Sequence, residues 1–212
     1  MDFVHQDIQH YAEAHTTPES DLLRKINRDT HATVLMPRML SGHLQGSVLA
    51  MISSMIRPKN ILEIGTYTGY SAICLAKGLQ PGGKLVTIDI NEELETKVRS
   101  YFSAAGLTAV IDYRIGNALE IIPTLTDQYD LVFIDADKEN YSRYFDIVLN
   151  RVNLNGFIVA DNVLWSGKVL DEKPDKDTRA ILAFNQKVHQ DARVENVLLP
   201  IRDGILVMRR VG

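Results

Sequence analysis

The residues best suited to chemistry are polar side chains that directly follow short apolar runs. Asp135 follows one such run, and the pair Asp161 and Asn162 follows the next one along the chain. One strand–helix–strand crossover separates the two groups, so we expect them at the ends of neighbouring strands. Two carboxylates and an amide are hard oxygen donors, which suit Mg²⁺, Mn²⁺ or Ca²⁺ better than zinc. The spacing therefore predicts a metal site with open positions for a substrate that carries two adjacent oxygens.

These residues also have a simpler interpretation. An aspartate at a strand end is often only the cap of the following helix, and for a single aspartate that interpretation would be preferred. Lys138 lies three positions beyond Asp135, where it could be a solvated surface lysine or pair with Asp135 or Asp137. Three oxygen donors at two strand ends, with a lysine beside them, favour the metal site.

A second set of candidate residues surrounds a glycine-containing loop. Residues 63–71 read Glu-Ile-Gly-Thr-Tyr-Thr-Gly-Tyr-Ser, at the point where a predicted strand gives way to a predicted helix. Gly65 permits a tight turn and a close approach of the backbone to a ligand. Asp89 ends the next apolar run, where an acid can accept hydrogen bonds from both hydroxyls of a ribose.

The spacing of the glycines selects among nucleotide-type ligands. Dinucleotide-binding loops carry G-x-G-x-x-G, whereas Gly65 and Gly69 form a G-x-x-x-G pattern. An adenosine with a compact zwitterionic tail, as in S-adenosylmethionine, is therefore favoured over NAD. The alternative is that both glycines only turn a strand into a helix and that Asp89 caps the next helix.

The chain around these motifs is expected to form strands that alternate with helices. Residues 1–57 are expected to form a helical N-terminal segment, and residues 58–212 a core of short apolar strands. The expected strands are 61–64, 85–88, 109–114, 131–134, 157–160, 194–201 and 205–209. The expected core helices are 70–79, 91–105, 117–124, 140–152 and 177–190. Strands buried on both faces predict an α/β fold, a mostly parallel seven-stranded sheet with helices on each side. The short turn at 203–204 makes the last two strands a hairpin, which predicts one antiparallel edge strand.

Length and composition limit the class of protein further. With 212 residues, 45% of them hydrophobic and 24% charged, the chain fits one globular domain. The single cysteine, Cys74, excludes a disulfide framework and a cysteine-based zinc site. The net charge of −4 gives no electrostatic footprint for nucleic acid, and no apolar run reaches the roughly 18 residues of a membrane helix. The first residues lack the basic and apolar regions of a signal peptide, so a cytoplasmic protein is expected.

Four stretches of the sequence are similar to the cation-dependent class I O-methyltransferases, a family that contains caffeoyl-CoA and catechol O-methyltransferases and many bacterial relatives. They are Ile-Leu-Glu-Ile-Gly-Thr-Tyr-Thr-Gly-Tyr-Ser at 61–71, Val-Thr-Ile-Asp-Ile at 86–90, Val-Phe-Ile-Asp-Ala-Asp-Lys-Glu-Asn-Tyr at 132–141 and Ala-Asp-Asn-Val-Leu-Trp-Ser-Gly-Lys-Val at 160–169. The resemblance extends from about Met36 to the end of the chain. It implies a single methyltransferase domain over 1–212 with a Rossmann-like fold, S-adenosylmethionine as cofactor, a divalent cation such as Mg²⁺, Mn²⁺ or Ca²⁺ with Mg²⁺ preferred, and a homodimer.

The resemblance also implies a cofactor site. Its residues would be Met39, Ser41, Glu63, Gly65, Tyr67, Ser71, Asp89, Ala118 and Asp135. Among them, Glu63, Gly65 and Ser71 would line the methionine side. Asp89 would hold the ribose and Ala118 would contact the adenine. The sequence departs from the family at Asn117, where many methyltransferases carry an acid near the adenine.

The same resemblance assigns the metal site and the base. Asp135, Asp161 and Asn162 match the three metal ligands, and Lys138 matches the lysine proposed as general base in the catechol enzymes. Gln45 stands where plant members carry glutamate, which weakens the carry-over of substrate contacts in that segment.

Together these features predict transfer of the methyl group of S-adenosylmethionine to one hydroxyl of a small catechol-type acceptor. The protein would mainly supply proximity and alignment, and neither a nucleic-acid nor a membrane partner is expected. One alternative is a non-catalytic S-adenosylmethionine-binding module, which would have no need of a metal and a base. Another is an NAD-dependent oxidoreductase, which the missing third glycine disfavours. Trp165 could line the acceptor or the cofactor, or could simply pack within its loop.

Overall fold

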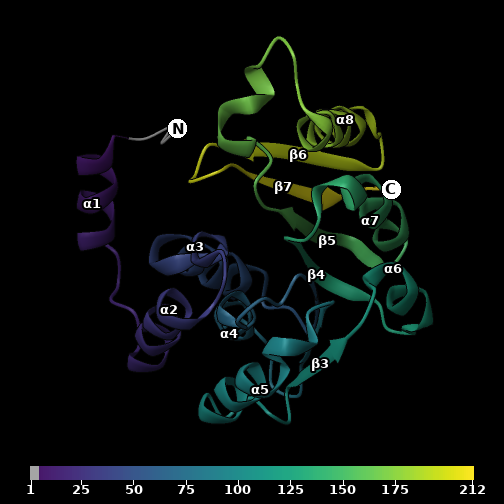
Figure 1. Cartoon of the computed structure of the whole chain (residues 1–212). Helices are drawn as coiled ribbons and strands as arrows, with labels where there is room; N and C mark the ends of the chain where they lie inside the picture. Colours follow the sequence, from purple (N-terminus) through teal and green to yellow (C-terminus); the bar gives the residue numbers. More distant parts are fainter. Residues whose placement is uncertain (1–4) are drawn as a thin grey trace.

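The structure, a computed structural model, describes residues 5–212 and is built around a seven-stranded sheet (Figure 1). The segment on which the expectation of no signal peptide rests lies almost entirely outside the described residues. The strands are β1 (Asn60–Ile64), β2 (Lys84–Asp89), β3 (Ile111–Ile115), β4 (Tyr129–Ile134), β5 (Val152–Ala160), β6 (Val194–Leu199) and β7 (Ile205–Arg210). Their order across the sheet is β3-β2-β1-β4-β5-β7-β6. Neighbours from β3 to β5 are parallel, whereas β7 runs antiparallel to both β5 and β6.

The predicted mostly parallel sheet with a terminal hairpin is confirmed, and the position of the reversed strand is now defined. The reversed strand is β7, which lies between β5 and β6, so β6 forms the edge. Burial explains this order, because an inner strand is covered on both faces. Ile205, Leu206 and Met208 of β7 are buried, whereas Val197 and Leu198 of β6 are exposed.

Helices cover both faces of the sheet, as predicted. The α-helices are α1 (Gln6–Ala14), α2 (Asp21–Thr33), α3 (Gly42–Ile56), α4 (Tyr70–Ala76), α5 (Glu95–Ala104), α6 (Ala118–Ile121), α7 (Tyr141–Leu149) and α8 (Lys176–Gln190). One apolar core joins the sheet to α6, α7 and α8, and a second joins the opposite face to α2, α3, α4 and α5 (Figure 1). Within residues 5–212, no helix combines the length and the apolar character that crossing a bilayer requires.

The helical N-terminal segment is also confirmed. Leu23 and Ile26 anchor α2 in the core, whereas α1 buries none of its residues. Short 3-10 helices complete the chain, namely η1 (Pro37–Met39), η2 (Glu92–Leu94), η3 (Ile122–Thr124), η4 (Lys138–Asn140) and η5 (Trp165–Leu170). The helix expected over 140–152 was too long, because Val152 already pairs with β4 as the first residue of β5.

Candidate functional site

The sheet brings the candidate loops to one edge. Parallel pairing aligns Ile64 of β1 with Ile88 of β2 and with Ile134 of β4, which in turn pairs with Ala160 of β5. The residues that directly follow these strands therefore emerge side by side at the carboxyl end of the sheet. Open α/β sheets bind their ligands at this edge. The glycine loop, Asp89 and the predicted metal ligands thus share one end of the molecule.

The glycine loop packs tightly against the loop that follows β4. Gly65 has a φ of 103°, and a Cβ built on it would lie 1.9 Å from the carbonyl oxygen of Asp135. Only glycine fits here, because a side chain would meet backbone that belongs to the neighbouring loop. This close approach joins the predicted cofactor loop to the predicted metal site.

Backbone donors hold the Asp89 carboxylate in place. The Tyr67 N–H donates to Oδ2 of Asp89 at 2.6 Å, and the Asn91 N–H donates to Oδ1 at 2.9 Å. Tyr67 adopts a left-handed φ of 48° to reach this position. Each carboxylate oxygen can accept a further hydrogen bond, so Asp89 is held in a fixed orientation and can still bind a diol.

A cavity of about 310 Å³ lies beside Asp89. Its lining includes three of the predicted cofactor residues, Gly65, Asp89 and Ala118. The remaining predicted cofactor residues (Met39, Ser41, Glu63, Tyr67, Ser71 and Asp135) do not line this cavity. The Asn117 side chain accepts from the Leu119 N–H and donates to Glu120, so it acts as the cap of α6.

Glu63 is a fully buried carboxyl group next to this cavity. Oε2 accepts a hydrogen bond from the Thr87 hydroxyl, whereas Oε1 has no partner. Burial raises the pKa of Glu63 to about 8, although the hydrogen bond from Thr87 opposes the rise. An unpartnered buried acceptor is costly unless a ligand donates to it. The arrangement suits a cationic ligand group such as an ammonium.

The Lys138 ammonium lies at the centre of the predicted metal cluster. Its Nζ donates to Oδ1 of Asp135 at 3.1 Å, to Oδ1 of Asn162 at 2.7 Å and to the Tyr141 hydroxyl at 2.7 Å. The Lys138 side chain is only 9% exposed, and its Nζ lies 5.6 Å from the centre of the Trp165 ring. The solvated-surface alternative for Lys138 is therefore wrong, and the alternative pairing with Asp135 is present. Two of the three predicted metal ligands already face a cation.

Asp161, the third predicted ligand, is buried and fixed from both sides. Its Oδ2 accepts from the Gln45 amide, and its Oδ1 accepts from the Asn162 N–H at 2.8 Å. Burial raises the pKa of Asp161 above its usual range, and the nearby Asp135 carboxylate adds to the rise. A positive charge bound between the two carboxylates would oppose both effects. Among residues 5–212, no cluster of three or more acidic, His or Cys side chains suggests a different metal site.

The N-terminal segment contacts the glycine loop through Tyr67. The Tyr67 hydroxyl donates to the backbone carbonyls of Leu35 at 3.3 Å and Met36 at 3.4 Å. Further along the segment Ser41 is buried, whereas Met39 remains 55% exposed. Of the two predicted residues, the structure therefore brings only Ser41 into the packed interior.

Sequence reasoning missed the partners of the predicted residues. Gln45 was noted only as a departure from the plant pattern, yet it reaches Asp161 across 116 positions of sequence. Tyr141 was not singled out, although a side chain three positions beyond Lys138 can share its helical face. The Tyr141 hydroxyl also donates to the carbonyl of Asp161 at 3.1 Å, so it connects the two loops that carry the predicted metal ligands.

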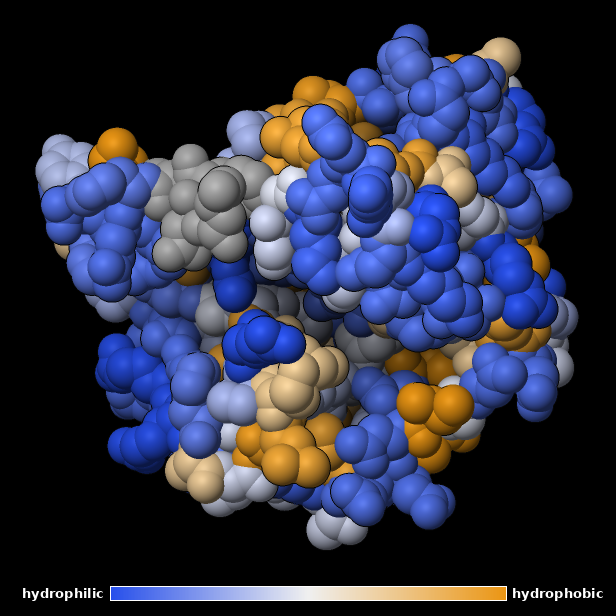
Figure 2. Space-filling view, turned by 45° about the horizontal axis from the view of Figure 1, so that its top comes forward, coloured by the Kyte–Doolittle hydropathy of each residue, from blue (hydrophilic) through white to orange (hydrophobic). Residues whose placement is uncertain are grey.

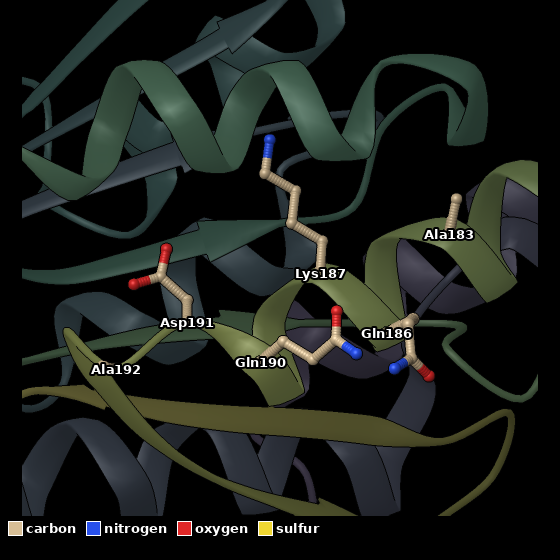
Figure 3. Close-up of a pocket in the computed structure, with 6 residues that line it drawn as sticks. All are labelled: Ala183, Gln186, Lys187, Gln190, Asp191 and Ala192. Carbon is tan, nitrogen blue, oxygen red and sulfur yellow. The ribbon is translucent and has the colours of Figure 1, made fainter.

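Other surface features carry less chemistry. An open hollow of about 650 Å³ lies beside the C-terminal half of α8, away from these loops (Figure 3). Lys187 at its wall is paired with Asp146 at 2.6 Å, and its lining offers no set of converging donors. Hydrophobic side chains on the face of Figure 2 lie in separate groups among hydrophilic ones. Although the hollow beside α8 is larger, the cavity at Asp89 is the better candidate site because polar groups converge on it.

The sheet topology, the glycine loop and the acid at the end of β2 define a Rossmann-like fold with a site for a nucleoside-type ligand. Comparison with known proteins gives the particular family. A family model described as O-methyltransferase matches residues 12–211. The chain therefore belongs to the O-methyltransferase family, and it is an S-adenosylmethionine-dependent methyltransferase. This assignment sets aside the oxidoreductase and the non-catalytic alternatives.

Individual relatives agree with the family model. Caffeoyl-CoA O-methyltransferase 1 of Eucalyptus globulus is 33% identical over 217 residues, covering 96% of this chain and 88% of that protein. The O-methyltransferase TomG of Streptomyces achromogenes, solved with SAM, matches with a TM-score of 0.88 at 29% identity, covering 97% of this chain and 96% of that chain. An O-methyltransferase from Bacillus cereus, solved with SAH, matches with a TM-score of 0.89 at 29% identity, covering 96% of this chain and 97% of that chain.

Proposed function

We propose that this enzyme transfers the methyl group of S-adenosylmethionine to one hydroxyl of a catechol-type acceptor, with the help of a divalent cation. The observation that carries the proposal is the convergence of Asp135, Asp161 and Asn162 around Lys138, beside a cavity suited to adenosine. An acceptor with two adjacent oxygens matches such a site. The names of relatives, including caffeoyl-CoA O-methyltransferases and a rice tricin synthase, support an aromatic acceptor.

The cofactor would lie along the carboxyl edge of the sheet. Ala118 would contact the adenine and Asp89 would accept the ribose hydroxyls, because both line the cavity. Glu63 would receive the ammonium group of the methionine moiety at its unpartnered oxygen. The other proposed contacts come from Met39, Ser41, Gly65, Tyr67, Ser71 and Asp135.

The donor set fits a divalent cation. Asp135, Asp161 and Asn162 would hold it through two carboxylates and an amide, the ligand chemistry of Mg²⁺ and also of Mn²⁺ and Ca²⁺. When bound, such an ion would hold both acceptor oxygens and favour loss of a hydroxyl proton. The Lys138 ammonium, which now bonds to two of these donors, would have to share them.

Lys138 would accept the hydroxyl proton in this scheme as the neutral amine, the form that a cation bound beside it would favour. Tyr141 and Asn162 hold its Nζ at the junction of the two loops, so the amine is directed by fixed partners rather than by solvent. The deprotonated oxygen would then attack the sulfonium methyl group in line, while the methyl–sulfur bond breaks and S-adenosylhomocysteine leaves. This step requires alignment more than covalent participation by the protein. The homodimer and the cytoplasmic location expected from the sequence stay predictions.

The test is methyl transfer from S-adenosylmethionine to protocatechuate, measured with Mg²⁺ and with EDTA. We expect turnover with Mg²⁺ and loss of turnover with EDTA that added Mg²⁺ restores. Turnover that ignores EDTA would show that the carboxylate cluster is not a metal site. Cofactor binding without turnover over a panel of small and large catechols would refute the proposed acceptor class.

A further inference from the structure

The hairpin turn between β6 and β7 is docked onto the loop that follows β5. The Leu164 N–H donates to the carbonyl oxygen of Asp203 at 2.9 Å, and the Val163 N–H donates to that of Gly204 at 3.2 Å. The Asp203 carboxylate reaches further and accepts a hydrogen bond from the Ser166 N–H through Oδ1. The turn therefore contacts the loop through backbone and side chain, 37 positions away in sequence.

The loop held in this way has an unusual backbone. Asn162, Trp165 and Ser166 have φ values of 57°, 47° and 53°, in the left-handed region that residues with a Cβ rarely occupy. A backbone in this region is strained for residues with a Cβ, so the conformation persists only where the surroundings impose it. Ser166 belongs to this strained stretch and directly follows Trp165, and its N–H is the group that donates to Asp203.

The turn packs closely against the loop that follows β5. A Cβ on Gly204 would lie 2.5 Å from Cγ of Leu164 and 2.9 Å from the Leu164 nitrogen. On its other side, Nη1 of Arg202 donates to the carbonyl oxygen of Leu40 at 3.2 Å. One turn thus contacts both the loop after β5 and the N-terminal segment that covers the site.

We propose that Asp203 is a positioning residue for the acceptor side of the active site. By accepting the Ser166 N–H, it fixes the loop in the conformation that places the Trp165 ring beside Lys138 and presents Asn162 to the same amine. Asp203 does not itself act on the substrate. This inference rests on the proposed function, because it takes the space beside Trp165 and Lys138 to be the acceptor site.

Kinetics give the first test, with Asp203→Ala and Asp203→Asn measured against the wild-type enzyme. We expect Asp203→Ala to raise the KM for the catechol roughly five- to thirty-fold, as loss of a charge-assisted hydrogen bond would. The KM for S-adenosylmethionine should stay unchanged, because Asp203 does not line the cofactor cavity. Asp203→Asn keeps an acceptor oxygen at the same place and should restore most of the acceptor affinity.

A matched control separates positioning from general stability. Asp130 also accepts backbone N–H groups, from Lys59 at 2.7 Å and Asn60 at 3.0 Å, but it lies near the start of β4, at the end of the strand opposite to the candidate loops. Asp130→Ala should lower the free energy of unfolding without changing the KM for the catechol. Equal rises in the acceptor KM for Asp130→Ala and Asp203→Ala would overturn the proposal.

Fluorescence gives a second test that does not depend on activity, because Trp165 is the single tryptophan of the chain. Acrylamide should quench Trp165 more strongly in Asp203→Ala than in the wild type, Asp203→Asn or Asp130→Ala. If Asp203→Ala does not fold, Asp203→Ser replaces it, since the shorter side chain cannot reach the Ser166 N–H. Unchanged quenching would overturn the proposal. Increased quenching in an enzyme that methylates no catechol would instead confirm the hold on the loop and refute the proposed function.

Discussion

Glu63 allows a direct test of the electrostatics of the proposed cofactor site. The carboxyl group has no exposed surface, and burial raises its pKa from 4.5 to about 8. In the unfolded chain the same group ionises near its ordinary value. Between these two pH values, folding requires Glu63 to take up a proton. Replacement by glutamine removes the titration and preserves the shape.

The sign and size of the effect follow from linkage. Because the folded-state pKa is the higher one, the wild type loses stability relative to Glu63→Gln as the pH rises through this window. The loss approaches about 1.4 kcal/mol per pH unit between about pH 5 and about pH 8, and adds up to on the order of 4 kcal/mol. Below the ordinary pKa both states are protonated, so the difference between the two proteins stays constant there.

The assay is urea unfolding of both proteins without cofactor at several pH values in this window, followed by circular dichroism. Glu172→Gln is the control, because that side chain is exposed and should give a difference that does not change with pH. Glu63→Gln leaves an amide N–H₂ in place of Oε1, so a constant offset is expected as well. A difference between wild type and Glu63→Gln that is flat from pH 5 to pH 8 would refute a buried, neutral Glu63.

Two further substitutions probe the neighbouring loops. Gly65→Ala should cost at least about 2 kcal/mol in the free energy of unfolding and abolish S-adenosylmethionine binding by calorimetry, because its Cβ would overlap the carbonyl of Asp135. Gly82→Ala is its control, since Gly82 also has a positive φ but has open space around it, and an equal loss in both would show that backbone strain alone is responsible. Lys138→Ala should keep cofactor binding and lower kcat by about 10²-fold or more, as loss of a general base does; full turnover at neutral pH would remove Lys138 from that role.

The fold could be predicted largely from the sequence because its signals are local. Short apolar runs that end in Gly65, Asp89, Asp135 and Asp161 mark four of the parallel strands, and their crossovers fix the edge at which these residues meet. The placement of β7 between β5 and β6 depends instead on which of the two hairpin strands is more buried. Burial depends on the tertiary packing, and the sequence pattern that predicts a hairpin gives no information about it.

The candidate site could be predicted only in part, for the same reason. Residue type and strand position singled out Asp135, Asp161 and Asn162, and a family motif added Lys138. The hydrogen bonds of Gln45 and Asp203 run from α3 and from the β6–β7 turn, and no spacing in the sequence indicates either contact. Partners that join distant segments become visible only when the packing of the whole domain is known.

The electrostatics of the site indicate what kind of ligand completes it. Glu63, Asp89 and Asp135 lie close enough for the two aspartates to raise the pKa of Glu63, and Asp135 raises that of Asp161. Lys138 offsets part of this negative charge but bonds only to Asp135 and Asn162 within the cluster. A cofactor with an ammonium and a sulfonium group, together with a divalent cation, would supply positive charge where the carboxylates crowd. Binding would then stabilise the fold, because it would give partners to carboxylate groups that folding alone leaves unpaired. The carboxylates at the carboxyl end of the sheet therefore favour positively charged ligands.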